Sequence, residues 1–285
     1  MSPDFDVFMV EPKPIPSAVP GFEQVAGQAT WPPSTSTLIW ADDEALLVDC
    51  LITTEEGRNL AAWVASHRGE LGYVYITHPH ADHFLGLTEI LAAFPQAKPV
   101  ALTESVPGME EQISPGYLRV WGGFFPGQLT DEPVAPQPLD GTGITIGGTT
   151  ATIIPVGVTD TANSSVVHVP DLNLVVAGDV VYNQTHMWLA RSTPESRASW
   201  ARALEAVDAL EAGTLIAGHR NPQAADDNAR RQVQECRRYL TDFAAALDRS
   251  ATPAELIDRI TDIYPDFANP YTLWVAAYDL LGART

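Results

Sequence analysis

The side chains best suited to bind a metal ion lie in one short stretch, Thr77-His78-Pro79-His80-Ala81-Asp82-His83. Three histidines and one carboxylate fall within six consecutive positions of this stretch. Imidazole and carboxylate are the ligands that Zn²⁺ and related divalent ions take. A solvated, histidine-rich turn is the alternative interpretation, but single polar loops rarely gather this ligand set. The stretch therefore indicates a metal centre.

The segments on either side of this stretch predict how its side chains are presented. Residues 73–76 are β-branched and aromatic and read as a buried strand, whereas residues 84–94 have helical spacing of apolar residues and stop at a proline. His78 and His80 are two apart, so in an extended segment both imidazoles point to one side. Asp82 and His83 then fall in the turn into the helix and can aim at a second point a few ångströms away.

Two more metal-ligand residues are expected at strand ends in the second half. The predicted strand 174–177 ends in Gly178-Asp179, and the predicted strand 215–217 ends in Gly218-His219. A single aspartate or histidine at a strand end is ordinarily a turn residue. Three strand ends that each deliver a metal-ligand residue favour a common site instead.

The remaining pattern predicts alternating strands and helices. Strands are expected at 37–40, 45–49, 98–103, 144–146, 150–156 and 164–169, and helices at 54–67, 194–212, 223–249, 253–264 and 269–281. Residues 104–140 are rich in proline and glycine and are expected to be irregular, with Trp121, Phe124 and Phe125 forming either a local core or a pocket wall. Asp49, at the end of its strand, is read either as a solubilising residue or as a hydrogen-bond partner of the metal loop. His67 is read as a surface histidine at the end of its helix and not as a ligand, and His168 is read as structural.

The composition excludes several classes of protein. The 285 residues are long enough for a sizeable core, and 45 % apolar residues is ordinary for a globular protein. A net charge of −20 argues against nucleic acid and anionic membranes as partners, which need a positive surface. Cys50 and Cys236 cannot form a disulfide framework and are expected to be buried. We see no secretory signal and no apolar run long enough to span a membrane, so the expected location is the cytoplasm.

The motifs described above resemble those of the metallo-β-lactamase superfamily. The resemblance rests on the His-x-His-x-Asp-His signature at 78–83, on Gly-Asp at 178–179 and on Gly-His at 218–219, and it covers roughly residues 35–222. It implies an α/β fold, a four-layer αβ/βα sandwich with two sheets face to face, helices outside and a C-terminal helical extension. Residues 1–34 would then be a Pro-rich lead-in, and residues 223–285 helices that cap the site or form a homodimer surface.

The resemblance also implies a ligand for each of two metals. His78 and His80 would hold the first metal; Asp82, His83 and His219 would hold the second; and Asp179 would bridge the two. One position departs from the family pattern, because Val158 stands where the first metal would take a third histidine. We therefore expect the first site to be weakened and the second to bind normally, with Asp160 as a candidate substitute ligand.

The function implied is hydrolysis of a lactone, lactam, ester or thioester through a metal-bound hydroxide. Asp82 would ligate and orient the nucleophile or shuttle a proton, and Tyr182 or His186 would donate a hydrogen bond to the oxyanion or leaving group. Zinc is the expected cofactor, one or two ions per chain, with iron or manganese as alternatives, and the partner is a small-molecule substrate. The alternative function is a non-hydrolytic binding or iron-dependent redox protein on the same fold.

Overall fold

Two β-sheets form the centre of the molecule in the computed structural model, which describes residues 2–282. The first sheet has the strand order β1-β4-β5-β6-β7-β8. Its strands are β1 Asp4–Met9, β4 Thr35–Ala41, β5 Glu44–Val48, β6 Glu70–Ile76, β7 Lys98–Ala101 and β8 Gln137–Pro138. From β5 to β8 neighbouring strands are parallel, whereas β1, β4 and β5 pair antiparallel.

The second sheet has the order β13-β12-β11-β10-β9 and is antiparallel except for the pair β12 and β13. Its strands are β9 Gly143–Ile146, β10 Thr149–Gly157, β11 Ser164–Val169, β12 Leu174–Asn183 and β13 Thr214–Arg220. Apolar side chains from both sheets, among them Ile39, Tyr75, Ile153 and Val167, form one buried cluster between them. The two sheets therefore pack face to face.

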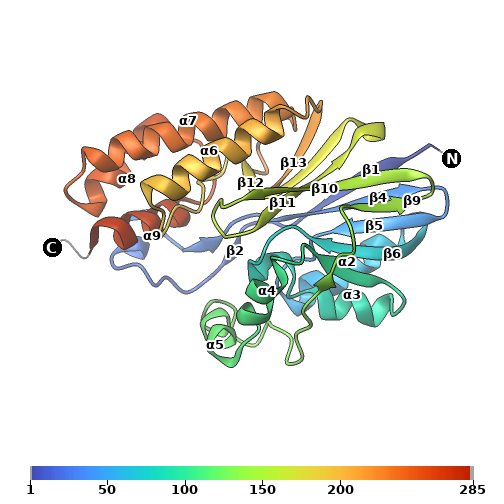
Figure 1. Cartoon of the computed structure of the whole chain (residues 1–285). Coiled ribbons are helices and arrows are strands. Elements are labelled where there is room, and N and C mark those ends of the chain that lie inside the picture. The colour runs from blue at the N-terminus through green and yellow to red at the C-terminus, as the bar shows by residue number, and fades with distance from the viewer. Residues whose placement is uncertain (1, 283–285) are drawn as a thin grey trace.

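Helices cover the outer face of each sheet, as Figure 1 shows. α2 Thr54–Ala65 and α3 Leu87–Ala93 pack on the first sheet, together with α4 Val106–Gln112 and α5 Pro115–Phe124. α6 Pro194–Asp208 and α7 Ala229–Asp248 pack on the second sheet. The predicted four-layer αβ/βα sandwich is thus confirmed.

The C-terminal helices are part of the core of the second sheet. α8 Pro253–Ile263 and α9 Pro270–Leu281 contribute Leu256, Ile260 and Leu273 to the same buried cluster as β12 and β13. Tyr271 of α9 instead packs in the cluster of the first sheet, and its hydroxyl accepts a hydrogen bond from the backbone N–H of Ala18. The helical extension therefore joins the two halves of the molecule.

Residues 2–34 contain short elements as well as loops. β1 adds an edge strand to the first sheet, β2 Lys13–Pro14 pairs with β3 Thr30–Trp31, and α1 Phe22–Ala26 packs near α9. Phe22 makes edge contacts with Tyr271 and Trp274 of α9. This segment is therefore bound to the domain at several points.

Several boundaries differ from the prediction for physical reasons. Residues 104–140 were expected to be irregular, but α4 and α5 form there, each with a proline in its first turn, where the missing N–H costs nothing. The helix expected at 84–94 is shorter, because a 3-10 turn at Ala81–His83 precedes α3. Trp121 and Phe125 are buried against Trp31, which supports the local-core interpretation of these aromatics.

Other predictions hold. The helix predicted from residue 54 begins with a capping box in which the side chains of Thr53 and Glu56 each accept a hydrogen bond from a backbone N–H. Cys50 and Cys236 are both buried and free. Among the helices of residues 2–282, the structure contains none that is both long and apolar enough to cross a membrane.

Candidate metal centre

The predicted metal-ligand residues converge at one edge of the sandwich, from both sheets. His78 follows β6, and the short turn Ala81–His83 carries Asp82 and His83. Asp179 lies on β12 and His219 on the neighbouring parallel strand β13. Both were expected at strand ends, but β12 and β13 continue past them, with register shifts around Gly178. The bulged backbone turns Asp179 toward the edge without ending the strand.

Two glycines permit the close approach of these segments. Gly178 has φ +48°, and a Cβ atom there would lie 2.4 Å from Thr77 Oγ1. A Cβ atom on Gly218 would lie 2.4 Å from Asp179 Oδ1 and 2.9 Å from His83 Cε1. Since Cβ atoms do not approach other atoms this closely, any larger residue would push the two halves of the centre apart.

The second ligand group consists of Asp82, His83 and His219, with Asp179 shared. The Nε2 atoms of His83 and His219 lie 3.2 Å from Asp179 Oδ1 and Oδ2 respectively. His219 Nε2 lies 3.4 Å from Asp82 Oδ2. Atoms that each bind one ion at about 2.1 Å stand roughly 3 to 3.5 Å apart, so these spacings suit a common divalent ion.

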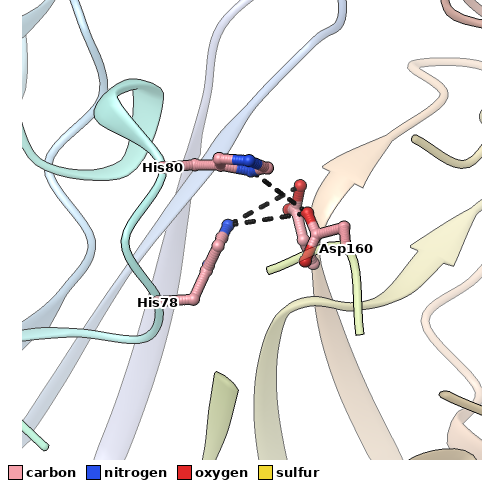
Figure 2. A group of neighbouring side chains, drawn as sticks. His78, His80 and Asp160 are labelled. Atoms are coloured by element: carbon pink, nitrogen blue, oxygen red, sulfur yellow. Dashed lines mark ion pairs between the residues drawn. The ribbon is translucent and has the colours of Figure 1, made fainter. Parts of the chain in front are cut away.

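The first ligand group consists of His78, His80 and Asp160, again with Asp179 shared. Figure 2 shows the two imidazoles facing the Asp160 carboxylate. His80 Nδ1 lies 3.1 Å from Asp160 Oδ2, and His78 Nε2 lies 3.8 Å from Asp160 Oδ2 and 3.9 Å from Asp179 Oδ2. The ligand atoms of this group all lie within 4.8 Å of one another.

The donor atoms fit a metal because they lack other partners. His78 Nε2, His83 Nε2, Asp160 Oδ2 and Asp179 Oδ1 are buried without a hydrogen-bond partner. Leaving buried polar atoms unpaired costs free energy, on the order of 1–3 kcal/mol each. Two divalent ions, one at each ligand group, would satisfy all four.

The electrostatics of the centre also favour bound positive charge. Burial opposes protonation of His83 and His219, but Asp179 and the neighbouring carboxylates outweigh this effect. They raise the pKa of His83 well above its usual value and that of His219 to about 9. Burial works against ionisation of Asp179, yet His219 and His83 hold its pKa well below the usual range. Burial lowers the pKa of His78 to about 4, which leaves that imidazole neutral. A divalent ion would take the place of the protons.

Hydrogen bonds at the far ring nitrogens orient the histidines. His83 Nδ1 donates to Asp49 Oδ2 over 2.9 Å. The Thr77 hydroxyl donates to the same Asp49 oxygen and accepts from His78 Nδ1 over 3.0 Å. Both histidines therefore present the lone pair of Nε2 to the centre. Asp49 was predicted as either solubilising or a partner of the metal loop, and the structure shows the latter.

The N-terminal segment orients two members of the second ligand group. The indole N–H of Trp31 donates to Asp82 Oδ2 over 3.0 Å, and His219 Nδ1 donates to the backbone carbonyl of Pro33 over 3.1 Å. Neither contact was foreseen, since a Pro-rich lead-in gives no signal of what it packs against. Thr77 was missed too, although its place directly before His78 was a usable signal.

The structure separates Val158 from Asp160. Val158 is 41 % exposed and is not a member of the first ligand group, whereas the Asp160 side chain is 0 % exposed and faces both histidines. His67, predicted as a surface residue, bonds to Trp63 O and Asp6 away from the centre. His168 lies on β11 and is part of neither group among the described residues.

The two other predicted catalytic residues lie in different surroundings. The Tyr182 hydroxyl donates to Asp179 Oδ2 over 2.7 Å, so it contacts the shared ligand directly. His186 is buried, and its Nδ1 is 2.8 Å from the Tyr239 hydroxyl in an aromatic cluster with Phe267. A hydrogen bond from either residue to substrate stays a prediction.

Comparisons with known proteins agree with this geometry. The model of the metallo-beta-lactamase superfamily matches residues 29–219. No match is found among curated proteins. Among solved structures, a metallo-beta-lactamase family protein from Thermus thermophilus superposes with a TM-score of 0.63 at 16 % identity, covering 97 % of this chain and 92 % of the other.

Two further solved structures share the fold at similar distance. A metallo-beta-lactamase from Pontibacter korlensis gives a TM-score of 0.58 at 16 % identity, covering 84 % of this chain and 100 % of that one. The FIM-1 metallo-beta-lactamase of Pseudomonas aeruginosa, in its mono-zinc form, gives 0.54 at 16 % identity, covering 84 % and 91 %. At such identities the likeness concerns the fold alone.

Proposed function

Because the chain belongs to the metallo-beta-lactamase superfamily, we propose that it is a metal-dependent hydrolase of small molecules with a lactone, lactam, ester or thioester bond. The observation that carries the proposal is the pair of ligand groups on either side of Asp179, which belongs to the first and lies 3.2 Å from His83 and His219 of the second, with buried donor atoms that have no other partner. A divalent ion at such a site acts as a Lewis acid that activates water and polarises a carbonyl oxygen. Zinc is the first candidate, and manganese or iron are alternatives.

The chain's own residues would divide the remaining work. Asp82 stands at the second ligand group and would orient the attacking water and accept its proton. Tyr182 donates to Asp179 and would fix the orientation of the shared carboxylate. His186 is kept neutral because burial lowers its pKa to about 3, and since its Nδ1 is bonded to the Tyr239 hydroxyl, a hydrogen bond to the leaving group would have to come from Nε2. The cluster is closed to bulk water except at His80, whose side chain is 20 % exposed, so substrate would approach from that side.

A substrate panel tests the proposal. Full-length protein is made metal-free, reloaded with Zn²⁺ or Mn²⁺, and assayed with a lactone, an aryl ester, a thioester and a β-lactam. We expect at least one class to be hydrolysed by the reloaded protein, and the activity to vanish with the metal. Reloaded protein with two bound metals that hydrolyses none of the four would contradict the proposal.

A redox function is the second candidate, and one observation favours it. Each ligand group offers two histidines and a carboxylate, which is the set that non-haem iron uses. Protein loaded with Fe²⁺ under anaerobic conditions would then consume oxygen when exposed to air, beyond the rate of free Fe²⁺. Equal rates with and without protein would eliminate this candidate.

A further inference from the structure

We infer that Asp160 is the third protein ligand of the first metal, in place of the histidine that the family pattern has at position 158. The two sites then have equal donor sets: two histidines, one carboxylate of their own and the shared Asp179. The inference deepens the proposed function and rests on it, because it concerns the metal that the hydrolysis requires. It also revises the expectation of a weakened first site: the site keeps a third protein ligand, but this ligand is a carboxylate and not a histidine.

The two oxygens of Asp160 have separate roles in the structure. Oδ1 accepts hydrogen bonds from the backbone N–H of Thr161 over 2.8 Å and from the Thr159 hydroxyl over 2.9 Å. Oδ2 has no hydrogen-bond partner and stands 3.1 Å from His80 Nδ1 and 3.8 Å from His78 Nε2. The carboxylate is therefore fixed by one oxygen and presents the other, fully buried, to the two histidines.

A bulge explains why Asp160 faces inward and Val158 outward. The pairing of β10 with β11 slips between Pro155 and Gly157, and Gly157 has φ +83°, a conformation open to glycine. The chain leaves the sheet at this point, so the ordinary alternation of strand side chains no longer applies. Val158 is exposed in consequence, and the ligand position passes to the residue two places later.

The loop that carries Asp160 is held in place on both sides. The Thr159 and Thr161 hydroxyls lie 2.7 and 3.1 Å from the Ser164 hydroxyl. Asn163 donates from Nδ2 to the backbone carbonyl of Glu104, and its own backbone carbonyl accepts from the Ser105 hydroxyl. Such supporting bonds are what a metal ligand needs to keep its orientation.

The change of donor alters which ions the first site takes. A carboxylate oxygen is a harder ligand than an imidazole nitrogen, and it suits Mn²⁺ and Fe²⁺ better. We expect the first site to bind Mn²⁺ with an affinity close to that of the second site. If the first site had three histidines and the second only two, the two sites would instead bind zinc with different affinities and fill one after the other.

Metal titration of the full-length protein tests the inference. Metal-free wild type, Asp160→Ala, Asp160→Asn and the control Val158→Ala are titrated with Mn²⁺, and free Mn²⁺ is followed by electron paramagnetic resonance. We expect two equivalents in wild type and Val158→Ala but one in Asp160→Ala, with the dissociation constant of the lost site raised about a hundredfold or more. Asp160→Asn keeps the buried shape and decides the matter if the alanine variant fails to fold.

The Asp82→Ala background identifies which equivalent is lost. Asp82→Ala removes a ligand of the second group only, so its one remaining equivalent belongs to the first site. Adding Asp160→Asn to that background should remove this equivalent, whereas adding Val158→Ala should not.

Two equivalents of unchanged affinity in both Asp160 variants would overturn the inference and leave the proposed hydrolase standing. One equivalent in wild type would also overturn it. Two equivalents in wild type and one in the variants, with no hydrolysis of any panel substrate, would leave the inference standing and refute the hydrolase.

Discussion

The two ligand groups of the centre have matching donors but are held in different ways. The first is supported by its own neighbours in the chain: Thr77 bonds to His78, and Thr159 and Thr161 bond to Asp160. The second is supported from afar, by Asp49 on the adjoining strand end and by Trp31 and Pro33 of the N-terminal segment. The bonds that directly reach ligands of the first group therefore come from adjacent residues, whereas those that reach the second group come from distant segments.

Removing the shared ligand Asp179 should have the largest effect, because it should abolish metal binding at both groups. Asp179→Ala takes one donor from each group and leaves His83 and His219 without their main counter-charge. We expect both metals to be lost and hydrolysis to fall by about a thousandfold or more, since a metal supplies several kcal/mol of transition-state stabilisation and about 1.36 kcal/mol is tenfold. Metal analysis after gel filtration checks the loss. A variant that retained either metal at full affinity would show that Asp179 does not link the groups.

Substitution of the supporting residues should separate the groups. Asp49→Asn weakens the hold on His83 Nδ1 directly and on His78 only through Thr77, so it should lower second-site affinity by about ten- to a hundredfold and first-site affinity by less. Thr159→Val keeps the shape but removes the hydroxyl bond to Asp160 Oδ1, which no ligand of the second group shares, and should lower first-site affinity by a smaller factor, about tenfold. Titration of each variant with Mn²⁺ measures both sites. Equal losses at both sites in both variants would contradict separate support.

Trp31 and Trp121 form a matched pair for the N-terminal support. Both lie in one aromatic cluster, but the indole N–H of Trp31 donates to Asp82, whereas that of Trp121 donates to Gln112. Trp31→Phe should weaken the second site by about tenfold, because a hydrogen bond to a charged group contributes about 1.5 kcal/mol. Trp121→Phe should leave both sites unchanged. The same loss in both variants, again measured by Mn²⁺ titration, would assign the effect to packing.

The smallest expected difference is kinetic. The His80 side chain is 20 % exposed, while those of His83 and His219 are 1 % and 4 % exposed. A chelator should therefore remove the first metal several times faster than the second. Stopped-flow measurement of Mn²⁺ release should then show two phases of equal amplitude. A single phase would indicate that both ions leave through one opening of the centre.

The sequence predicted the parts of the centre that depend on local pattern. The segment 77–83, Asp179 and His219 were found because each follows a recognisable strand, and the sandwich followed from the family resemblance that these motifs carry. Asp160 was only a substitute candidate, because the register of β10 shifts between Pro155 and Gly157 and no periodicity reveals how the following loop directs its side chains. Trp31 could not be found, since its partner Asp82 is 51 positions away and only tertiary packing joins them.

The bond from Trp31 to Asp82 gives the protein an internal optical reporter. An indole donor held 3.0 Å from a carboxylate oxygen in a mostly buried place has an emission that responds to the charge on that oxygen. Filling the second site should shift this fluorescence, and filling the first should leave it nearly constant. Because the chain has seven tryptophans, the difference between titrations of wild type and Trp31→Phe isolates the Trp31 signal and shows when the second site fills.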